Sequence, residues 1–308
     1  MKDFEILRQL WYDSCMNILE YENYHEKITH GKMVFPYNTY LCSIPLDFPE
    51  VPLHWHDEFE IIYIKKGSGC ITVDFRQYKV MAPTIVFIVP GQLHSIGQLD
   101  DSAMEYENII FHPSLLISRK SDVTTSEFLQ PLMSGKITVP TVFTPVYPYF
   151  RDVAAPIDAC DEICRTMPQG YELYIKSQLF QFFFILNNRC RNLCAPKEPR
   201  RTLEKMKIVL KYIENNYMHK ITIAEIAAAV DFSESHFMRY FKDTMGTTFV
   251  DYLKDYRLTM ASRLLTTSDS SILDIAAETG FDNLSYFNRA FKNKYHTTPR
   301  QFRKESRE

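Results

Sequence analysis

Residues 221–253 read ITIAEIAAAVDFSESHFMRYFKDTMGTTFVDYL, and residues 272–303 read ILDIAAETGFDNLSYFNRAFKNKYHTTPRQFR. The second stretch repeats the first about fifty residues further along the chain, with one extra residue in its middle. Matching positions, first copy before second, are Ile223 and Ile272, Ile226 and Ile275, Ala227 and Ala276, Phe232 and Phe281, Phe237 and Phe287, Arg239 and Arg289, Phe241 and Phe291, and Lys242 and Lys292. Such a repeat indicates one structural unit that occurs twice.

Each copy predicts a short apolar helix, a tight turn and a second helix with an apolar and a basic face, which is the pattern of a helix-turn-helix. Thr222 and Glu225 have the spacing of a capping box at the start of the first short helix. Ser233 is the expected cap of the next helix, and Asp282 is the expected cap in the second copy. Helical periodicity also predicts a helix over residues 202–217 and a joining helix over residues 252–265.

The second helix of a helix-turn-helix lies in the major groove of DNA. Arginine is the commonest reader of guanine, asparagine suits adenine, apolar groups suit the thymine methyl, and lysine suits phosphates. The residues expected to face DNA are Ser235, His236, Met238, Arg239, Lys242, Leu284, Ser285, Asn288, Arg289 and Lys292. The alternative is a helical repeat that binds protein, but the matching Arg and Phe-Lys positions of the two copies favour DNA.

These motifs resemble those of the AraC/XylS family of bacterial transcription regulators, over about the last hundred residues. The second repeat of that family reads I-x-x-I-A-x-x-x-G-F, then Y-F-x-R-x-F-K, then P-x-x-[YF]-R. The residues that carry the resemblance are Ile272, Ile275, Ala276, Gly280, Phe281, Tyr286, Phe287, Arg289, Phe291, Lys292, Pro299, Phe302 and Arg303. Two positions depart from the family pattern: His296 replaces a usual Gly, and Phe249 a frequent Pro.

The resemblance implies two recognition helices in adjacent major-groove segments, about 34 Å apart. It implies that bases are read by Ser235, Met238, Arg239, Leu284, Ser285, Asn288 and Arg289. It further implies a regulator that binds promoter DNA, contacts RNA polymerase and activates more often than it represses. An N-terminal cupin-like domain that binds a small-molecule effector, often a sugar, is common in this family.

The chain of 308 residues is long enough for two domains, and its composition is that of a soluble globular protein. Residues 200–308 contain 18 Lys and Arg against 14 Asp and Glu, whereas the remaining residues contain 17 against 24. The basic C-terminal part therefore suits DNA, although the net charge of the whole chain is -3.

The first residues do not read as a signal peptide, and no apolar run approaches the roughly 20 residues that span a bilayer. Seven cysteines without a disulfide framework are typical of a cytoplasmic protein with reduced thiols. Cys160 with Cys164, and Cys190 with Cys194, lie one helical turn apart. We interpret them as buried small residues rather than as redox or zinc pairs.

Residues 39–111 have the texture of a β-sandwich or barrel, with short apolar or alternating runs between Pro and Gly. Residues 59–64 and 70–75 read as strands separated by a turn at residues 66–69, and residues 85–89 as a buried strand that ends at Pro90-Gly91. Residues 112–150 are mixed and rich in proline, and the domain that contains the barrel is expected to end near residue 150.

His54, His56 and Glu60 are separated by even numbers of residues, so one extended strand would direct all three into the barrel, and His94 could arrive from another strand. Three imidazoles and a carboxylate can hold a divalent metal. The spacing resembles the cupin motif H-x-H-x3-E-x6-G, completed by Gly67, although the second half of the motif is incomplete. The open alternatives are a pocket for an effector, a metal site without or with enzymatic activity, and a structural remnant.

Residues 153–167 and 171–192 read as helices separated by Pro168-Gln169-Gly170. The second helix is so apolar that it must be covered on more than one side, by the barrel alone or by a second subunit as well. A charged, Pro-containing linker follows at residues 194–201. The expected domains are a cupin-like sensor (1–150), a helical dimerisation segment with the linker (151–198) and a double helix-turn-helix domain (199–308).

The sequence thus predicts a multidomain α and β protein: a homodimeric, cytoplasmic, non-enzymatic regulator that requires no cofactor unless a divalent metal occupies the His and Glu residues. Phosphate-binding Gly loops and catalytic motifs are absent from the sequence. The alternatives are a cupin metal-binding protein or metalloenzyme fused to a DNA-binding domain, and a regulator whose N-terminal domain only dimerises.

Overall fold

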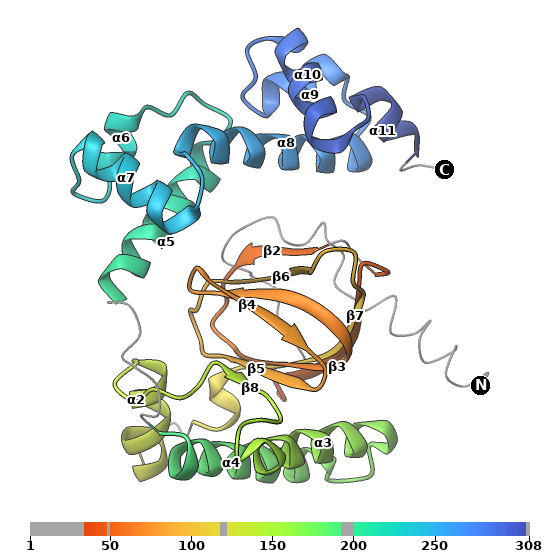
Figure 1. Ribbon diagram of the computed structural model, residues 1–308, viewed down its shortest axis with the longest axis vertical. Helices are drawn as coiled ribbons and strands as arrows, with labels where there is room; N and C mark the ends of the chain where they lie inside the picture. Colours follow the sequence, from red (N-terminus) through yellow and green to blue (C-terminus); the bar gives the residue numbers. More distant parts are fainter. Residues whose placement is uncertain (1–33, 48–49, 118–121, 192–199, 306–308) are drawn as a thin grey trace. The chain divides into compact units, whose positions relative to one another are not determined.

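The computed structural model describes residues 34–47, 50–117, 122–191 and 200–305. The predicted linker lies almost entirely outside these residues. The chain divides into two compact units, Met1–Glu198 and Pro199–Glu308, called here the barrel unit and the helical unit. Figure 1 shows strands with helices beside them in the first and helices alone in the second.

The barrel unit is built on antiparallel strands in two layers. One layer has the order β1-β7-β3-β5-β8, while β2 pairs with β6, and both β4 and β6 pair with β3. The strands are β1 (Tyr37–Ile44), β2 (Glu50–His54), β3 (Phe59–Val73), β4 (Arg76–Met81), β5 (Thr84–Ile88), β6 (His94–Gln98), β7 (Met104–Phe111) and β8 (Val142–Phe143).

The turn predicted at residues 66–69 is wrong, because β3 is one strand that belongs to both layers. Its register against β7 shifts between Ile64 and Lys66. A Cβ at Gly67, which has φ 74°, would lie 1.9 Å from the carbonyl oxygen of Ala103, so this glycine permits an irregularity in the strand rather than a reversal. The reversal comes at Asp74 and Phe75, both with positive φ, before β4.

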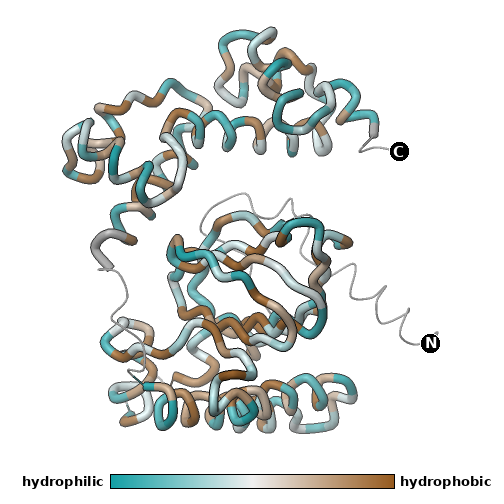
Figure 2. Tube along the Cα trace, in the orientation of Figure 1, coloured by the Kyte–Doolittle hydropathy of each residue, from teal (hydrophilic) through white to brown (hydrophobic). Residues whose placement is uncertain are grey.

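Side chains alternate along β3 between two apolar cores. Phe59, Ile61 and Tyr63 face a core shared with α3 (Phe150–Thr166) and α4 (Tyr171–Arg189), while Ile62 and Ile64 face the barrel interior. Figure 2 shows the strands nearest these helices as predominantly hydrophobic. The predicted helix pair is confirmed, with Gly170 at φ 83° in the break. The shorter elements η2 (Pro113–Leu115), η3 (Thr125–Leu129) and α2 (Gln130–Met133) precede β8.

The buried face of α4 packs on the barrel through aromatic rings. Phe183 lies 5.0 Å from Phe59, and Phe182 lies 5.4 Å from Phe87, measured between ring centroids. The opposite face leaves Leu173, Phe180 and Phe184 exposed to 75%, 40% and 65%. The barrel unit by itself therefore covers only one side of this helix.

The helical unit contains the two predicted helix-turn-helix units in succession. Its helices are α5 (Arg200–Asn216), α6 (Ile223–Ala228), α7 (Glu234–Met245), α8 (Phe249–Thr267), α9 (Ile272–Glu278), α10 (Leu284–Tyr295) and α11 (Pro299–Glu305). The first unit turns from α6 into α7, the second turns from α9 into α10, and α8 joins the two (Figure 1).

Two of the three predicted helix caps are confirmed: the capping box of Thr222 with Glu225 and the cap at Ser233. The exception is Asp282. Asn283 caps α10 instead, because its Oδ1 accepts the N–H of Tyr286 at 2.9 Å, three residues on, and Asp282 lies one residue too early for that contact. His296 adopts φ 58° at the end of α10, so it occupies the left-handed position that glycine normally takes.

Candidate functional site

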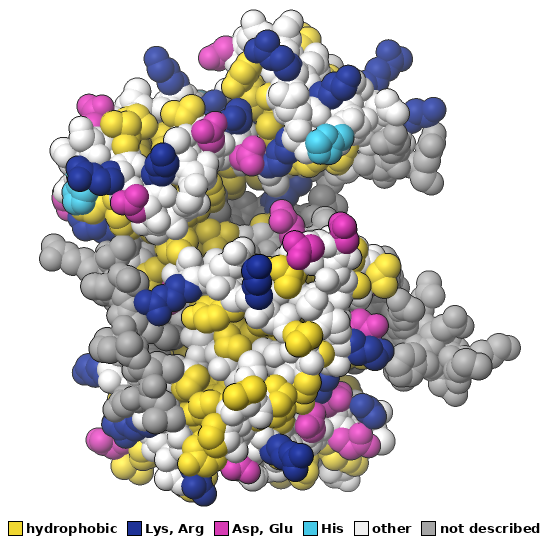
Figure 3. Space-filling view, in the orientation of Figure 1, with side chains coloured by type: hydrophobic (Ala, Val, Ile, Leu, Met, Phe, Trp, Pro, Cys, Tyr) yellow, Lys and Arg dark blue, Asp and Glu magenta, His cyan; other side chains and the backbone are white. Residues whose placement is uncertain are grey.

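All ten residues predicted to face DNA are exposed on α7 and α10. The outward face of α7 carries Ser235, His236, Met238, Arg239 and Lys242, and that of α10 carries Leu284, Ser285, Asn288, Arg289 and Lys292. Phe237, Phe241, Phe287 and Phe291 are all fully buried on the opposite faces. Figure 3 shows Lys and Arg side chains spread over the visible face of the helical unit.

Two aromatic contacts orient side chains on these outward faces. The ring of His236 lies 4.1 Å from that of Phe232, between centroids, and the Arg289 guanidinium lies 5.8 Å from the centroid of Tyr286. Tyr286, 45% exposed, was not among the predicted DNA-facing residues. Its position between Asn283 and Arg289, three residues from each on the outward side of α10, could have indicated it.

His54, His56 and Glu60 come from successive segments rather than from one strand, and His94 comes from another strand, as predicted. His54 is the last residue of β2, Glu60 is the second of β3, and His94 opens β6. His56 lies between β2 and β3, where its carbonyl oxygen accepts the N–H of Gly91 at 2.8 Å. The single strand predicted for His54, His56 and Glu60 is therefore wrong, because β2 ends at His54. The predicted proximity of His94 is present, since His54 and His94 are directly paired across β2 and β6.

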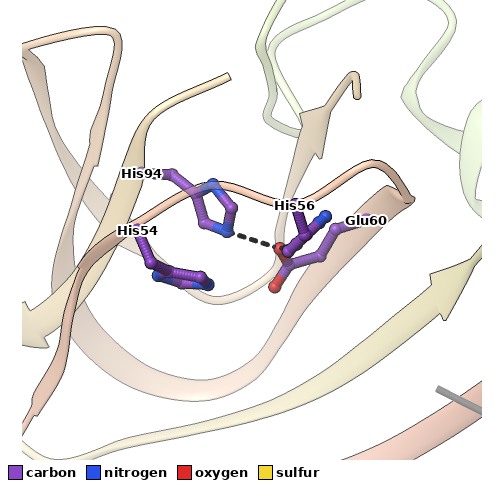
Figure 4. A group of neighbouring side chains, drawn as sticks. All are labelled: His54, His56, Glu60 and His94. Carbon is purple, nitrogen blue, oxygen red and sulfur yellow. Dashed lines mark hydrogen bonds and ion pairs between the residues drawn. The ribbon is translucent and has the colours of Figure 1, made fainter. Parts of the chain in front are cut away.

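The four side chains form a compact buried cluster, called here the His–Glu cluster. One donor atom from each of His54, His56, Glu60 and His94 lies within 4.8 Å of all the others, and none of the four residues is more than 3% exposed. A single carboxylate oxygen of Glu60 lies 2.7 Å from Nε2 of His94 and 2.9 Å from Nε2 of His56. Figure 4 shows the rings and the carboxyl group converging.

Burial alone would raise the pKa of Glu60, but the charge of His94 and hydrogen bonds from His56 and His94 outweigh it and hold that pKa well below its usual range. The Nδ1 atoms of His54 and His94 face the carbonyl oxygens of Pro52 and Gln92, at 2.8 and 2.9 Å. A carbonyl can only accept, so both Nδ1 atoms donate a hydrogen. Each ring then turns its Nε2 inward.

This arrangement fits a divalent metal ion. Histidine ligands commonly donate the second ring N–H to a backbone carbonyl, which fixes the tautomer that offers a lone pair to the metal. Three imidazole nitrogens and one carboxylate oxygen suit Zn, Fe, Ni or Mn. The same arrangement also supplies hydrogen-bonding groups for a polar organic ligand.

The barrel interior carries further polar residues that the sequence reading missed. Asn108 on β7 is 2% exposed, and its Oδ1 has no hydrogen-bond partner among the described residues. It pairs across the sheet with Tyr40, whose hydroxyl accepts from Asn38 Nδ2 at 2.7 Å. The signal lay in the alternation of Met104, Tyr106, Asn108 and Ile110 along one strand. Asn108 therefore offers an unused acceptor inside the barrel.

The cysteine pair on α3 lies beside Tyr37 and away from the His–Glu cluster. Burial raises the pKa of Cys160 to about 12 and of Cys164 to about 11. Both thiols therefore stay protonated at neutral pH, which makes them poor nucleophiles and poor metal ligands. Their interpretation as buried small residues is consistent with these environments. Cys194 lies outside the described residues.

A sheet-rich ligand-binding unit followed by a double helix-turn-helix unit defines a DNA-binding transcription regulator with its own sensor domain. The chain matches the model of the AraC-like ligand-binding domain over residues 46–183 and that of a helix-turn-helix domain over residues 223–305. The chain belongs to the AraC family of transcriptional regulators, and the barrel unit is its cupin-like ligand-binding domain.

Relatives align along most of the chain. The uncharacterised HTH-type transcriptional regulator YdeC of Bacillus subtilis (strain 168) is 26% identical over 92% of this chain and 97% of its own length. The HTH-type transcriptional activator RhaS of Mannheimia succiniciproducens is 25% identical over 83% and 89%. The crystal structure of unsaturated fatty acid bound ToxT from Vibrio cholerae covers 87% of this chain and 94% of its own, with 17% identity and a TM-score of 0.41.

Both matched domains and the YdeC and RhaS relatives are those of transcriptional regulators, a class of protein that is not normally enzymatic. Among the described residues, no helix is both long enough and apolar enough to span a bilayer.

Replacing Asn108, whose buried Oδ1 is unsatisfied, by an apolar residue of similar size should stabilise the ligand-free protein. We expect Asn108→Leu to raise the free energy of unfolding by about 1 kcal/mol, since the desolvation cost of the amide disappears. Asn38→Leu is the matched control and should lower it by about 1 kcal/mol, since the bond to Tyr40 is lost. Urea unfolding of the full chain measures both, and a marked loss of stability in Asn108→Leu would contradict the account.

Proposed function

We propose that this chain is a cytoplasmic, non-enzymatic activator that binds promoter DNA as a homodimer, contacts RNA polymerase and responds to a small molecule bound inside the barrel. The observation that carries the DNA-binding assignment is the equivalence of the outward faces of α7 and α10. Arg239 with Lys242, and Arg289 with Lys292, occupy matching exposed positions on two helices whose other faces are buried. The activator assignment is supported by the similarity to RhaS, which is a transcriptional activator.

The two kinds of basic residue have different proposed roles. Arg239 and Arg289 read guanine, because a guanidinium matches the two acceptors of that base, and Asn288 reads adenine in the same way. Ser235, Met238, Leu284 and Ser285 contact neighbouring base edges. Lys242 and Lys292, one turn further along each helix, neutralise phosphates, and His236, held by Phe232, lies at the edge of the face.

The homodimer is proposed to form through the exposed face of α4. Leu173, Phe180 and Phe184 follow one another at helical spacing along the side opposite the barrel. Large apolar side chains gathered on one exposed face favour association. A second copy of the same helix offers a matching stripe, as a twofold interface requires.

The effector is proposed to be a polar small molecule, possessing hydroxyl groups, that donates a hydrogen bond to Oδ1 of Asn108. Carbohydrates meet that requirement, since each hydroxyl both donates and accepts. The His–Glu cluster supplies further polar contacts within the same barrel. Differential affinity for two states of the regulator would then shift its activity.

A second candidate is that the His–Glu cluster binds a divalent metal ion, and the inward Nε2 atoms and the compact donor set favour it. For zinc, four ligands supplied by the protein are the pattern of structural rather than catalytic sites. A metal would therefore stabilise the barrel or act as the effector, and the metalloenzyme alternative is the weaker one.

Removing either arginine should weaken specific DNA binding. For Arg239→Ala and Arg289→Ala we expect the binding free energy for the specific DNA fragment to fall by about 1–3 kcal/mol, with little change for the scrambled fragment. Lys242→Ala should instead weaken binding to both fragments and reduce the slope of log affinity against log salt concentration by about one. Fluorescence anisotropy with DNA selected by the full chain from a random pool, and with a scrambled fragment, measures this. Lys254→Ala on α8 is the charge-matched control; unchanged specific affinity in both arginine variants would contradict the assignment.

Introducing a charge into the apolar stripe of α4 should prevent association. Phe184→Glu should convert a dimer into a monomer, because the carboxylate would be buried without a partner. Sedimentation velocity of the full chain measures the change. Met81→Glu, which changes an equally apolar and exposed side chain on β4, is the control and should stay dimeric. A monomeric wild-type chain would refute the proposal.

A thermal-shift screen of the full chain separates the two ligand proposals. A ligand at a hundredfold excess over Kd stabilises the folded state by about 2.7 kcal/mol. A sugar effector should raise the melting temperature of the wild type in the presence of chelator but not that of Asn108→Leu. A metal should act on the wild type but not on His94→Ala, with His112→Ala as the control outside the cluster. If neither class shifts the wild type, both proposals fail.

A further inference from the structure

Among the described residues, α8 contributes buried apolar side chains to both helix-turn-helix units. The first half of α8 buries Phe249 and Leu253, with Phe249 lying 5.5 Å from Phe237 of α7 between ring centroids. The second half buries Leu258, Ala261 and Leu265 in the core of α9 and α10. Arg257 lies between these two sets.

Arg257 reaches back from α8 to the segment between α5 and α6. Its Nε donates to the carbonyl oxygen of Tyr217, and its Nη2 donates to that of His219, both at 2.8 Å. Tyr256, its neighbour on α8, places its ring 5.3 Å from that of Tyr217. A charged, two-point contact of this kind fixes an angle as well as a distance.

The second helix-turn-helix unit touches the same point through Gly280, in the turn between α9 and α10. A Cβ on Gly280 would lie 2.6 Å from the Tyr217 carbonyl oxygen and 2.9 Å from Cζ and Nε of Arg257. Gly280 also has φ 82°, in the left-handed region. The Tyr217–His219 segment, Arg257 and the Gly280 turn thus form one junction, called here the Arg257 junction.

The charges around the guanidinium also link the two units. Burial lowers the pKa of Arg257, and the charge of Asp282, two residues after Gly280, opposes that effect. A guanidinium forks toward two acceptors at once, whereas the compact ammonium of lysine would not hold both carbonyls. The contact is therefore specific to arginine at this position.

We propose that Arg257 is a positioning residue that sets the separation of recognition helices α7 and α10, and thereby the spacing of the two DNA segments that the protein reads together. The inference rests on the proposed use of both helices on DNA. Successive base pairs are about 3.4 Å apart along the axis and rotated by about a tenth of a turn. If the junction allowed α7 and α10 to move apart or together by a few ångströms, the protein would therefore also accept DNA in which the two segments are one base pair further apart or closer.

The test uses the full chain and a DNA fragment that the wild type enriches from a random pool, with derivatives in which one base pair is inserted or removed between the two protected segments. The wild type should lose about tenfold in affinity on each altered spacing, since one recognition helix then meets the wrong bases. Arg257→Ala should bind the original fragment more weakly and should discriminate between spacings by less than about threefold.

Two further variants make the result decisive. Lys254→Ala removes a charge from the same helix, where its partner is the exposed Asp251, and should keep the wild-type discrimination. Gly280→Ala pushes the junction apart from the other side and should reproduce the loss of discrimination, which covers the case in which Arg257→Ala does not fold. If Arg257→Ala or Gly280→Ala binds weakly but discriminates as the wild type does, the junction contributes only stability, and the inference is wrong. A wild type that is indifferent to spacing overturns both the inference and the paired use of α7 and α10.

Discussion

Two buried phenylalanines one turn apart determine how each recognition helix faces its surroundings. Phe237 with Phe241 in α7, and Phe287 with Phe291 in α10, are all fully buried. Full burial of one such side chain stabilises a fold by about 1.5–3 kcal/mol, so a pair outweighs most surface interactions in orienting a twelve-residue helix. Once the phenylalanines are buried, the basic residues of α7 and α10 must face outward. The proposed DNA surface is therefore a consequence of this packing.

This dependence explains why the helical unit could be predicted from sequence in detail. Helical periodicity, caps and a repeat all constrain the same few positions, and each is a local property. The cap at Asn283 was missed because Asp282 and Asn283 are adjacent and equally suitable in type. Only the exact start of α10 distinguishes them, and helix starts depend on tertiary packing as well as on the cap.

The sequence predicts that the barrel unit consists of short strands, but it does not predict where each strand begins and ends. The segment Lys66–Gly69 has the residues of a turn, yet the close approach of the Ala103 carbonyl oxygen to Gly67 makes a glycine necessary at that position inside a strand. Which glycine meets a distant backbone is not a local property. The His–Glu cluster was predicted by residue type, although from the wrong geometry. Asn108 was missed because the alternation along β7 groups it with Met104, Tyr106 and Ile110 but does not show that this face is the interior one.

The buried polar groups of the barrel interior require specific hydrogen-bonding partners, whereas its apolar side chains require only close packing. A carboxylate as buried as that of Glu60 is tolerated only with compensating charge and hydrogen bonds, which His56 and His94 supply. The Arg257 junction of the helical unit likewise depends on directional polar contacts. Apolar packing is not directional, so two separate cores on α8 leave the angle between them weakly defined. Directional bonds from one guanidinium to two carbonyl oxygens define it. In both units, apolar side chains provide the stability, while a few buried or half-buried polar contacts determine the geometry on which function depends.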